Sequence, residues 1–253
     1  MDNIDLYQMI FKRKSFHLFR NIGNDKISND ELETIKEYFK QTIPLDSSIK
    51  VDMKIVPGEK STCKRGEEYC IYLYSENKDN YLANIGYIGE QLDLKLVSMN
   101  IGTLWYGIGK DDKTRKDNLD FIIMIAISKV NDLTKYRKDM FKAKRKPLTE
   151  TWIGNEIEGV SNIVGYSPSS CNTQPWITKH IDDELQIYRY KKPGKRGIMP
   201  ADRVTFYNRI DIGIYLCILE LTLSYNHILF NRTLFIDNKD QEEVLVAKYK
   251  IKE

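Results

Sequence analysis

The sequence predicts an α+β protein built from two similar halves, each an antiparallel sheet flanked by helices. The first observation is the length of 253 residues, which suits one large domain or two small ones. The second is the balance of 42% apolar and 30% charged residues, typical of a soluble globular chain. The third is the order of expected elements, which nearly repeats along the chain. We therefore expect a first half at 1–133, a basic connector at 134–147 and a second half at 148–253.

The first half is expected to contain two helices, two strands, a long helix and a further strand. A helix within the first 20 residues ends in the basic turn 12–15. Ser28 and Glu31 match a capping box, in which each side chain binds a free backbone amide at the start of the next helix. Apolar alternation and helical spacing predict the rest. These elements are strands at 51–56 and 69–74, a long helix at 80–98, an extended segment at 102–107 and a buried strand at 121–127.

The second half is expected to repeat this order after Pro147. Apolar residues at helical spacing predict a helix that stops at Ser167, because the residue before Pro168 disfavours the helical conformation. Its apolar stripe is Trp152, Ile153, Ile157, Val160 and Val164. The turn at 182–184 predicts a hairpin of strands 176–181 and 185–190. A long helix at 208–225 and strands near 228–236 and 244–251 complete the half.

Composition and charge exclude several classes of protein. The net charge of +3 is too small for a dedicated nucleic-acid binder. The longest apolar run, 121–127, has seven residues, whereas a membrane-spanning helix needs about 20. The acidic N-terminus has no apolar core of a signal peptide. The four cysteines have no zinc-ligand spacing. We therefore expect free thiols, no metal, no membrane partner and a cytoplasmic location.

The segment Ser167-Pro-Ser-Ser-Cys-Asn-Thr-Gln-Pro-Trp176 is the most informative stretch of the chain. It combines a helix terminator with a row of short hydrogen-bonding side chains. Ser169, Ser170 and Asn172 can offer donors and acceptors to a planar polar ligand. The same residues are also common in a capped loop, and both interpretations remain open at this point.

The order of residues in this segment resembles the nitroreductase-like flavoprotein family, in which a helix ends in Pro-Ser-Ser-x-Asn-x-Gln-Pro-Trp. Three further matches support the resemblance. They are Arg13-Lys14-Ser15 after the first helix, the Gly-rich stretch 102–109 after the long helix, and Lys144-Arg145-Lys146-Pro147-Leu148.

The resemblance implies FMN at an interface between two such units, because family members are homodimers of one unit. The first half of this chain has the Arg-x-Ser group but lacks the Pro-Ser-Ser-x-Asn pattern, since Pro44-Leu-Asp-Ser-Ser48 stands there. The second half has the reverse, with Thr149-Glu-Thr-Trp152 at its first helix. This pattern predicts an intramolecular pseudo-dimer with one FMN site. A monomer would then form the site, with further self-association still possible.

The resemblance places the FMN phosphate near the first basic motif. Arg13 could bind the phosphate bidentately, Lys14 or Lys144 as a point charge, and Ser15 as a neutral donor, with Arg145 as a further candidate. The alternative for residues 12–14 is a solvated helix end favoured by the helix dipole. His17 could contact the ribityl chain or lie on the surface.

The flavin ring is expected between the remaining motif residues. Ser169, Ser170 and Asn172, after Pro168, would serve the polar edge of the ring or the ribityl hydroxyls. Trp105, Tyr106 and Gly107 would line the ring near N5, where glycine permits close approach of the backbone. The alternative for Trp105 and Tyr106 is a half-buried strand. The basic turn 191–196 could attract an anion or be a solvated loop.

The implied activity is an FMN-dependent oxidoreductase of the nitroreductase type. Hydride would pass from NADH or NADPH through FMN to a flat small-molecule acceptor such as a nitroaromatic or a quinone, with no catalytic side chain, because the cofactor does the chemistry. The alternatives are a flavin-binding storage or sensor protein, and a relative of the same fold that binds no flavin.

Overall fold

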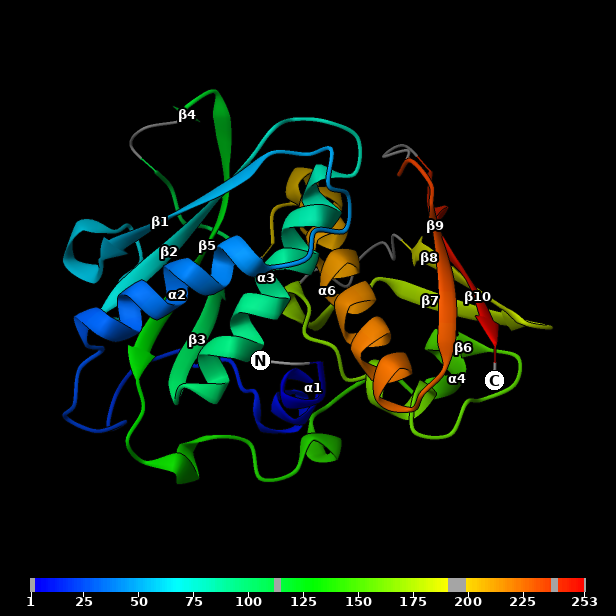
Figure 1. The fold of residues 1–253 in the computed structure, drawn as a ribbon, viewed down its shortest axis with the longest axis horizontal. Coiled ribbons are helices and arrows are strands. Elements are labelled where there is room, and N and C mark those ends of the chain that lie inside the picture. The colour runs from blue at the N-terminus through cyan, green and yellow to red at the C-terminus, as the bar shows by residue number, and fades with distance from the viewer. Residues whose placement is uncertain (1–2, 112–114, 191–198, 238–240, 253) are drawn as a thin grey trace.

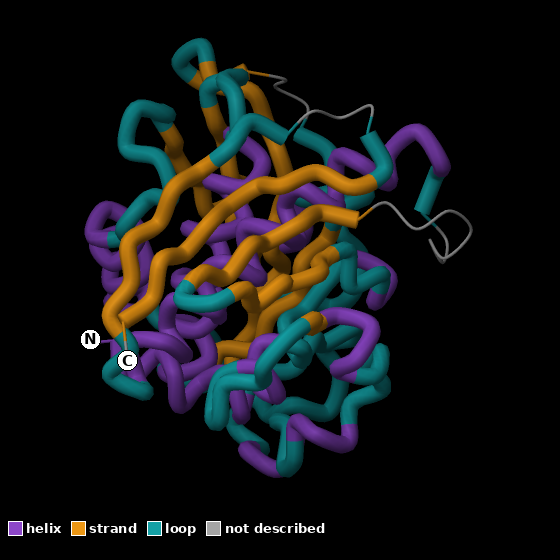
Figure 2. Tube along the Cα trace, turned by 90° about the vertical axis from the view of Figure 1, so that its right-hand side faces the viewer, coloured by secondary structure: helices purple, strands orange, loops and turns teal. Residues whose placement is uncertain are grey.

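The computed structural model describes residues 3–111, 115–190, 199–237 and 241–252, so the basic turn 191–196 lies outside the described residues. Two five-stranded sheets lie on opposite sides of a central pair of helices, α3 and α6 (Figure 1). Figure 2, viewed from the side of the second sheet, shows its strands in front of the helices. No described helix is long and apolar enough to cross a bilayer.

The first half contains three helices and a sheet in the order β1-β2-β5-β3, with β4 paired to β5. All its pairings are antiparallel. The elements are α1 (Asn3–Lys12), α2 (Asn29–Gln41), β1 (Val51–Pro57), β2 (Tyr69–Ser75), α3 (Tyr81–Ser98), β3 (Ile101–Tyr106), β4 (Arg115–Lys116) and β5 (Leu119–Lys129).

The second half contains a sheet in the order β6-β7-β8-β10-β9. Its pairings are antiparallel, apart from the short parallel pair of β6 and β7. The elements are α4 (Leu148–Thr151), β6 (Trp152–Ile153), α5 (Ser161–Val164), β7 (Trp176–Ile181), β8 (Glu184–Tyr190), α6 (Val204–Tyr225), β9 (Leu229–Leu234) and β10 (Glu243–Lys252). Short 3₁₀ turns lie at Gly58–Lys60, Leu133–Lys135, Met140–Lys142, Ser170–Asn172 and Ala201–Arg203.

The two sheets share one topology, which confirms the expected pair of similar halves. In each half a hairpin is followed by the long helix, and the last strand then inserts between the hairpin and the preceding strand. The order β1-β2-β5-β3 thus corresponds to β7-β8-β10-β9. The strand β6 has no counterpart in this correspondence.

The long helices cross at two glycines, one from each half. A Cβ atom on Gly86 would lie 2.0 Å from the carbonyl oxygen of Ile210, and one on Gly213 would lie 1.9 Å from that of Ala83. Only glycine permits this approach of the two backbones. Residues on most sides of both helices are buried, so the pair forms the centre of the hydrophobic core.

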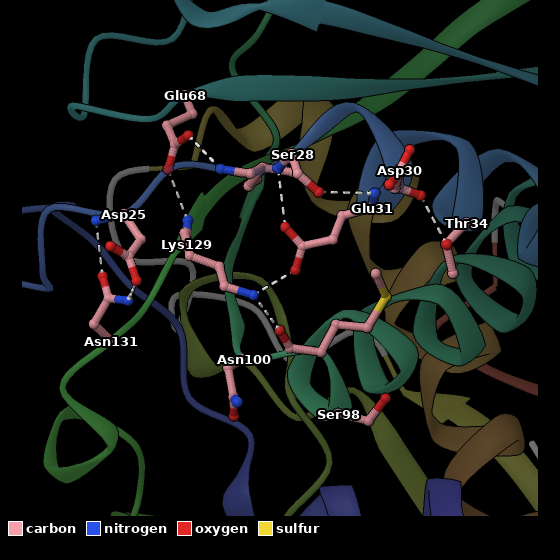
Figure 3. Close-up of polar contacts among 12 residues, drawn as sticks. Asp25, Ser28, Asp30, Glu31, Thr34, Glu68, Ser98, Asn100, Lys129 and Asn131 are labelled. Atoms are coloured by element: carbon pink, nitrogen blue, oxygen red, sulfur yellow. Dashed lines mark hydrogen bonds and ion pairs between the residues drawn. The ribbon is translucent and has the colours of Figure 1, made fainter.

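The cap of α2 agrees with the sequence prediction and also attaches the helix to the sheet (Figure 3). Ser28 Oγ accepts from the amide of Glu31 at 3.2 Å, and Glu31 Oε2 accepts from the amide of Ser28 at 2.9 Å. Glu31 also forms an ion pair with Lys129 of β5. The capping glutamate therefore links the start of α2 to the central strand of the first sheet.

The helix expected across 148–167 is wrong. The segment forms two separate four-residue turns, α4 and α5, with β6 between them. Gly154 and Gly159 have φ of +94° and +70°, which interrupts any continuous helix. A Cβ on Gly154 would lie 2.2 Å from the carbonyl oxygen of His180, because the chain here runs against β7. Ile153, expected in the apolar stripe, is 49% exposed, while the other stripe residues are buried.

Candidate functional site

The loop at residues 168–174 joins α5 to β7 and has an unusual backbone. Cys171, Asn172 and Gln174 all have positive φ, at 50°, 56° and 48°. Positive φ is uncommon outside glycine and is costly enough to persist only where surrounding contacts enforce it. Such strain concentrates at ligand sites.

Two hydrogen bonds fix this loop. The amide of Ser170 donates to Asp211 Oδ1 of α6 at 2.9 Å, and the amide of Gln174 donates to Ser169 Oγ at 3.0 Å. Burial raises the pKa of Asp211 to about 7, although its hydrogen bonds with Ser170 and Thr173 act in the opposite direction. Pro168, Ser169 and Ser170 are half-buried and Asn172 is exposed.

The basic connector lies against this loop. Arg145 Nη1 donates to Asn172 Oδ1 at 2.9 Å, and Asn172 Nδ2 donates to the carbonyl oxygen of Lys144 at 3.0 Å. The amide of Lys146 donates to Gln174 Oε1 at 2.9 Å. The structure thus brings together Arg145 and Asn172, which the sequence assigned to one site from distant positions, whereas the Lys144 side chain is exposed.

Three arginines gather beside the connector. The pKa of Arg145 is lowered to about 10, first by burial and then by the positive charges of Arg137 and Arg13. Burial and the charge of Arg13 also lower the pKa of Arg137. In the part of the chain that the structure describes, Arg145 Nε and Arg13 Nη2 are buried without a hydrogen-bond partner. A cluster of this kind suits an anion that accepts these donors.

The position of Arg13 is set by a buried carboxylate of α3. Arg13 Nε donates to Asp93 Oδ2 at 2.8 Å and lies 3.7 Å from Glu90 Oε1. Asp93 also accepts from Thr103 Oγ1 at 2.6 Å and from Trp105 Nε1 at 2.8 Å. Asp93 therefore orients the basic motif and the end of β3 together.

Glu90 is fully buried beside this group, and burial raises its pKa to about 8. The positive charge of Arg13 opposes this shift of the Glu90 pKa, and the negative charge of Asp93 adds to it. Asp93 Oδ2, at 2.8 Å, lies closer to Arg13 Nε than Glu90 Oε1 does.

The other residues of the first motif separate into two groups. Ser15 forms a parallel bridge with Thr103, so the motif runs along the edge of β3. Lys14 and His17 have exposed side chains, and Lys14 Nζ donates to the carbonyl oxygen of Lys135 at 3.0 Å. The structure therefore does not bring Lys14 and His17 into the cluster of Arg13, Arg137 and Arg145.

The end of β3 reaches the second half. The carbonyl oxygen of Gly107 accepts from Tyr207 Oη at 2.5 Å, and a Cβ on Gly107 would lie 2.7 Å from the Tyr207 ring. Trp105 packs against Gly89, and the Arg65 guanidinium lies 5.9 Å from the centre of the half-buried Tyr106 ring. Trp105 and Tyr106 are half-buried in β3, as the strand interpretation expects, and Gly107 follows the strand at the junction of the halves.

Sequence reasoning missed two residues of this region. Arg137 stands in the basic run that had been identified as the connector, so its charge was visible but its neighbours were not. Asp93 lies on the apolar long helix. A carboxylate at a core-facing position of such a helix is the signal that could have identified it.

Comparison with known proteins bears on the family and the fold of the chain. A family model described as "Putative TM nitroreductase" matches residues 5–223. A "putative nitroreductase" from Thermotoga maritima has a TM-score of 0.60 at 19% identity and covers 99% of this chain and 95% of its own. At this level of sequence identity, the similarity shows that the two chains share a fold.

Two further solved structures match over a smaller part of the chain. A nitroreductase family protein from Clostridium difficile has a TM-score of 0.45 at 13% identity, with 59% of this chain and 96% of its own covered. A "putative nitroreductase in complex with FMN" from Desulfovibrio desulfuricans has a TM-score of 0.42 at 14% identity, with 60% of this chain and 97% of its own covered.

No curated protein matches the chain. The family model spans most of the sequence, and the chain belongs to this nitroreductase family.

Proposed function

We propose that this protein is an FMN-dependent oxidoreductase that passes hydride from NADH or NADPH to a flat electrophilic small molecule, such as a nitroaromatic or a quinone. The observation that carries the proposal is the contact of Arg145 with Asn172 of the strained loop 168–174, beside the unpartnered buried donors Arg145 Nε and Arg13 Nη2. The charges of Arg137 and Arg13 lie close enough to lower the pKa of Arg145. The membership in a nitroreductase family supports the redox chemistry.

The donors at this site fit a flavin phosphate. A phosphate monoester carries close to two negative charges and accepts several charge-assisted hydrogen bonds. Arg145 Nε and Arg13 Nη2 are buried donors with no protein partner among the described residues. We assign the phosphate to Arg13, Arg137 and Arg145, and Ser15 would add a neutral donor. Lys14, His17 and Lys144 are exposed, and we place them at the rim of the site.

The remaining residues fit a flat ring with polar edges. Ser169, Ser170 and Asn172, held after Pro168 by Asp211 and Arg145, would bind the polar edge of the flavin. Trp105, Tyr106 and Gly107 would lie along the ring. FMN supplies the hydride chemistry when bound, and the protein residues bind and orient it. Asp93 is a positioning residue, because it holds both Arg13 and Trp105.

One such site per chain follows from the distribution of residues between the halves. Arg13 belongs to the first half and Ser169 to Asn172 to the second, so one chain folded as a pseudo-dimer would complete the site as a monomer. The boundaries 1–133, 134–147 and 148–253 are part of this proposal. The cysteines are free thiols, as expected for a reducing compartment, and we propose a cytoplasmic location.

The test combines flavin binding with turnover. We expect the purified chain to be yellow or to take up one FMN, and to oxidise NADH or NADPH when a quinone or nitroaromatic is added. Replacement of the exposed Lys40 of α2 with alanine serves as a control that leaves both readouts unchanged. Failure to bind FMN would refute the proposal. FMN binding without nicotinamide oxidation would instead support a storage or sensor protein.

A further inference from the structure

The connection between β1 and β2 brings three metal-ligating side chains together. Cys63 Sγ, Cys70 Sγ and a carboxylate oxygen of Glu67 all lie within 4.8 Å of one another. Both cysteines are fully buried, and Glu67 is half-buried. The sequence spacing Cys-x3-Glu-x2-Cys gave no zinc pattern, because the ligands meet only when the connection folds back onto β2.

The surrounding backbone orients the carboxylate. Glu67 Oε2 accepts from the amide of Arg65 at 2.8 Å, and Glu67 Oε1 accepts from Ser61 Oγ at 3.2 Å. Ser61 Oγ in turn accepts from the amide of Cys63 at 3.1 Å. Metal ligands in proteins are commonly held in this way by an outer layer of hydrogen bonds.

The second half shows that the fold does not require these ligands. Its corresponding hairpin, β7 to β8, turns through Asp182 and Asp183 alone, whereas β1 and β2 are joined by residues 58–68. Leu185 and Ile187 of β8 pack in the main core, as Ile71 and Leu73 of β2 do, whereas Cys63 and Cys70 pack together in a second cluster on the other face of the first sheet. The long insertion at 58–68 and its two thiols are thus features of the first half that the hairpin of the second half lacks.

We propose that Cys63, Glu67 and Cys70 bind a divalent thiophilic cation, zinc, with a water molecule as the fourth ligand. Zinc binds thiolate sulfur at about 2.3 Å and carboxylate oxygen at about 2.0–2.2 Å in a tetrahedral arrangement, which places the ligand atoms about 3.6–3.8 Å apart. The three ligand atoms lie within 4.8 Å of one another, so they need to approach one another by at most about 1.2 Å to bind one ion. Binding releases the two thiol protons to solvent.

The bound ion would fix a segment that borders the proposed flavin site. The amide of Phe19 donates to the carbonyl oxygen of Arg65 at 2.8 Å, and Phe19 follows the basic motif closely. The guanidinium of Arg65 lies over the Tyr106 ring at the end of β3. Zinc in this loop would therefore hold Arg65 beside Tyr106 and stabilise residues 58–68.

The test measures metal directly and needs no enzyme activity. We expect the full chain, purified without chelator, to contain one zinc ion. Cys63→Ala and Cys70→Ala should each abolish zinc binding, whereas Cys217→Ala, which removes a buried thiol of α6, should retain it. Cobalt(II) added to the metal-free chain should give thiolate-to-cobalt absorption, which both ligand variants lose.

A more conservative substitution tests the proposal if the cysteine variants do not fold. Glu67→Gln keeps the size of the side chain, and we expect zinc affinity to fall at least about tenfold, the smallest effect usual for disturbed metal sites. A chain that takes up neither zinc nor cobalt, with both thiols free, would overturn the proposal. A Cys63–Cys70 disulfide in the purified chain, seen as a mass lower by two hydrogens, would overturn it too.

Discussion

The halves meet at two junctions, and each junction is bordered by a loop that binds the long helix of its own half through an equivalent backbone amide. At one, loop 168–174 docks on α6 through the amide of Ser170 and Asp211 Oδ1. At the other, loop 44–48 docks on α3 through the amide of Asp46 and Asn84 Oδ1, at 3.1 Å. Asp211 and Asn84 each precede the crossing glycine of their helix by two residues. Loop 44–48, which lacks the Pro-Ser-Ser-x-Asn pattern, is thus the structural counterpart of loop 168–174, which has it.

A cavity of about 970 Å³ lies at the second junction, and residues of both halves line it. Its walls include loop 45–49, the start of α3, and part of α6 with the end of β9. Here Asp237 pairs with Arg189 at 2.6 Å and lies 3.4 Å from Arg209. At the first junction Arg145 binds only neutral oxygens among the described residues. The two junctions therefore differ in their charge balance, because Arg189 and Arg209 share the carboxylate of Asp237, whereas Arg145 has no carboxylate partner among the described residues.

The largest expected effect separates the two junctions by affinity for FMN. Arg145→Ala removes a charged donor at the first junction and should weaken binding by about 1.5–3 kcal/mol, or roughly ten- to a hundredfold. Arg209→Ala at the second junction should leave FMN affinity unchanged, because Arg209 already contacts Asp237. Fluorescence titration of the apoprotein with FMN measures both. Equal losses in the two variants, or two FMN per chain, would contradict the assignment.

A second expected effect tests whether the halves share their packing. Gly86→Ala and Gly213→Ala each place a methyl group against a backbone carbonyl at the helix crossing. Both should lower the free energy of unfolding by about 1–3 kcal/mol, by similar amounts. Gly165→Ala is the matched control, since the nearest atom to its Cβ would be 3.8 Å away. Urea denaturation followed by circular dichroism checks all three. A stable Gly86 variant beside an unstable Gly213 variant would break the equivalence.

Much of the fold follows from local sequence, whereas the site follows only in part. The cap at Ser28 and Glu31 and the alternation of β1 and β2 are local signals, and the structure agrees with them. The failed helix at 148–167 has apolar helical spacing, but Gly154 adopts positive φ because β7 lies against it. That contact is not visible in sequence.

The loop 168–174 was identifiable from its order of residues, and the resemblance placed Arg13 and Arg145 at one phosphate site, but the place of Arg137 beside them was not predicted. Arg137 and Arg13 stand far apart in the chain, and only folding of the connector over α1 brings them together, with the amide of Arg137 donating to the carbonyl oxygen of Lys12 at 3.2 Å. Asp93 likewise has its role through partners on α1 and β3.

The third prediction uses pH to separate Asp211 from its neutral counterpart Asn84. Burial raises the pKa of Asp211 in the folded chain to about 7, above the usual value of about 3.9. The folded state thus holds the proton more tightly, so this contribution to stability is complete below about pH 4 and is lost as pH rises toward 7. Asp211→Asn should remove that part of the pH dependence.

The measurement is the free energy of unfolding of both proteins at several pH values between about 4 and 8. Glu90 titrates in the same direction, since burial raises its pKa to about 8, so Glu90→Gln is the control that isolates its share. If Asp211→Asn and the parent chain keep parallel pH profiles, Asp211 is ionised throughout the range.

The smallest expected effect concerns the hydrogen bonds that join the start of each long helix to a segment after a strand of the opposite half. Tyr207 Oη donates to the carbonyl oxygen of Gly107 at 2.5 Å, and on the other side Asn80 Oδ1 accepts from the amide of Asp237 at 3.3 Å. Tyr207→Phe keeps the ring against Gly107 and removes only the hydroxyl, so it should lower the free energy of unfolding by about 0.5–1.5 kcal/mol. Asn80→Ala removes a longer hydrogen bond but also places alanine at a φ of 62°, so it should cost a similar amount. Since Gly107 borders the proposed flavin site and Asp237 does not, only Tyr207→Phe should also alter FMN affinity. Parallel urea denaturation and FMN titration separate the two results, and an FMN effect from Asn80→Ala would place cofactor binding at the second junction as well.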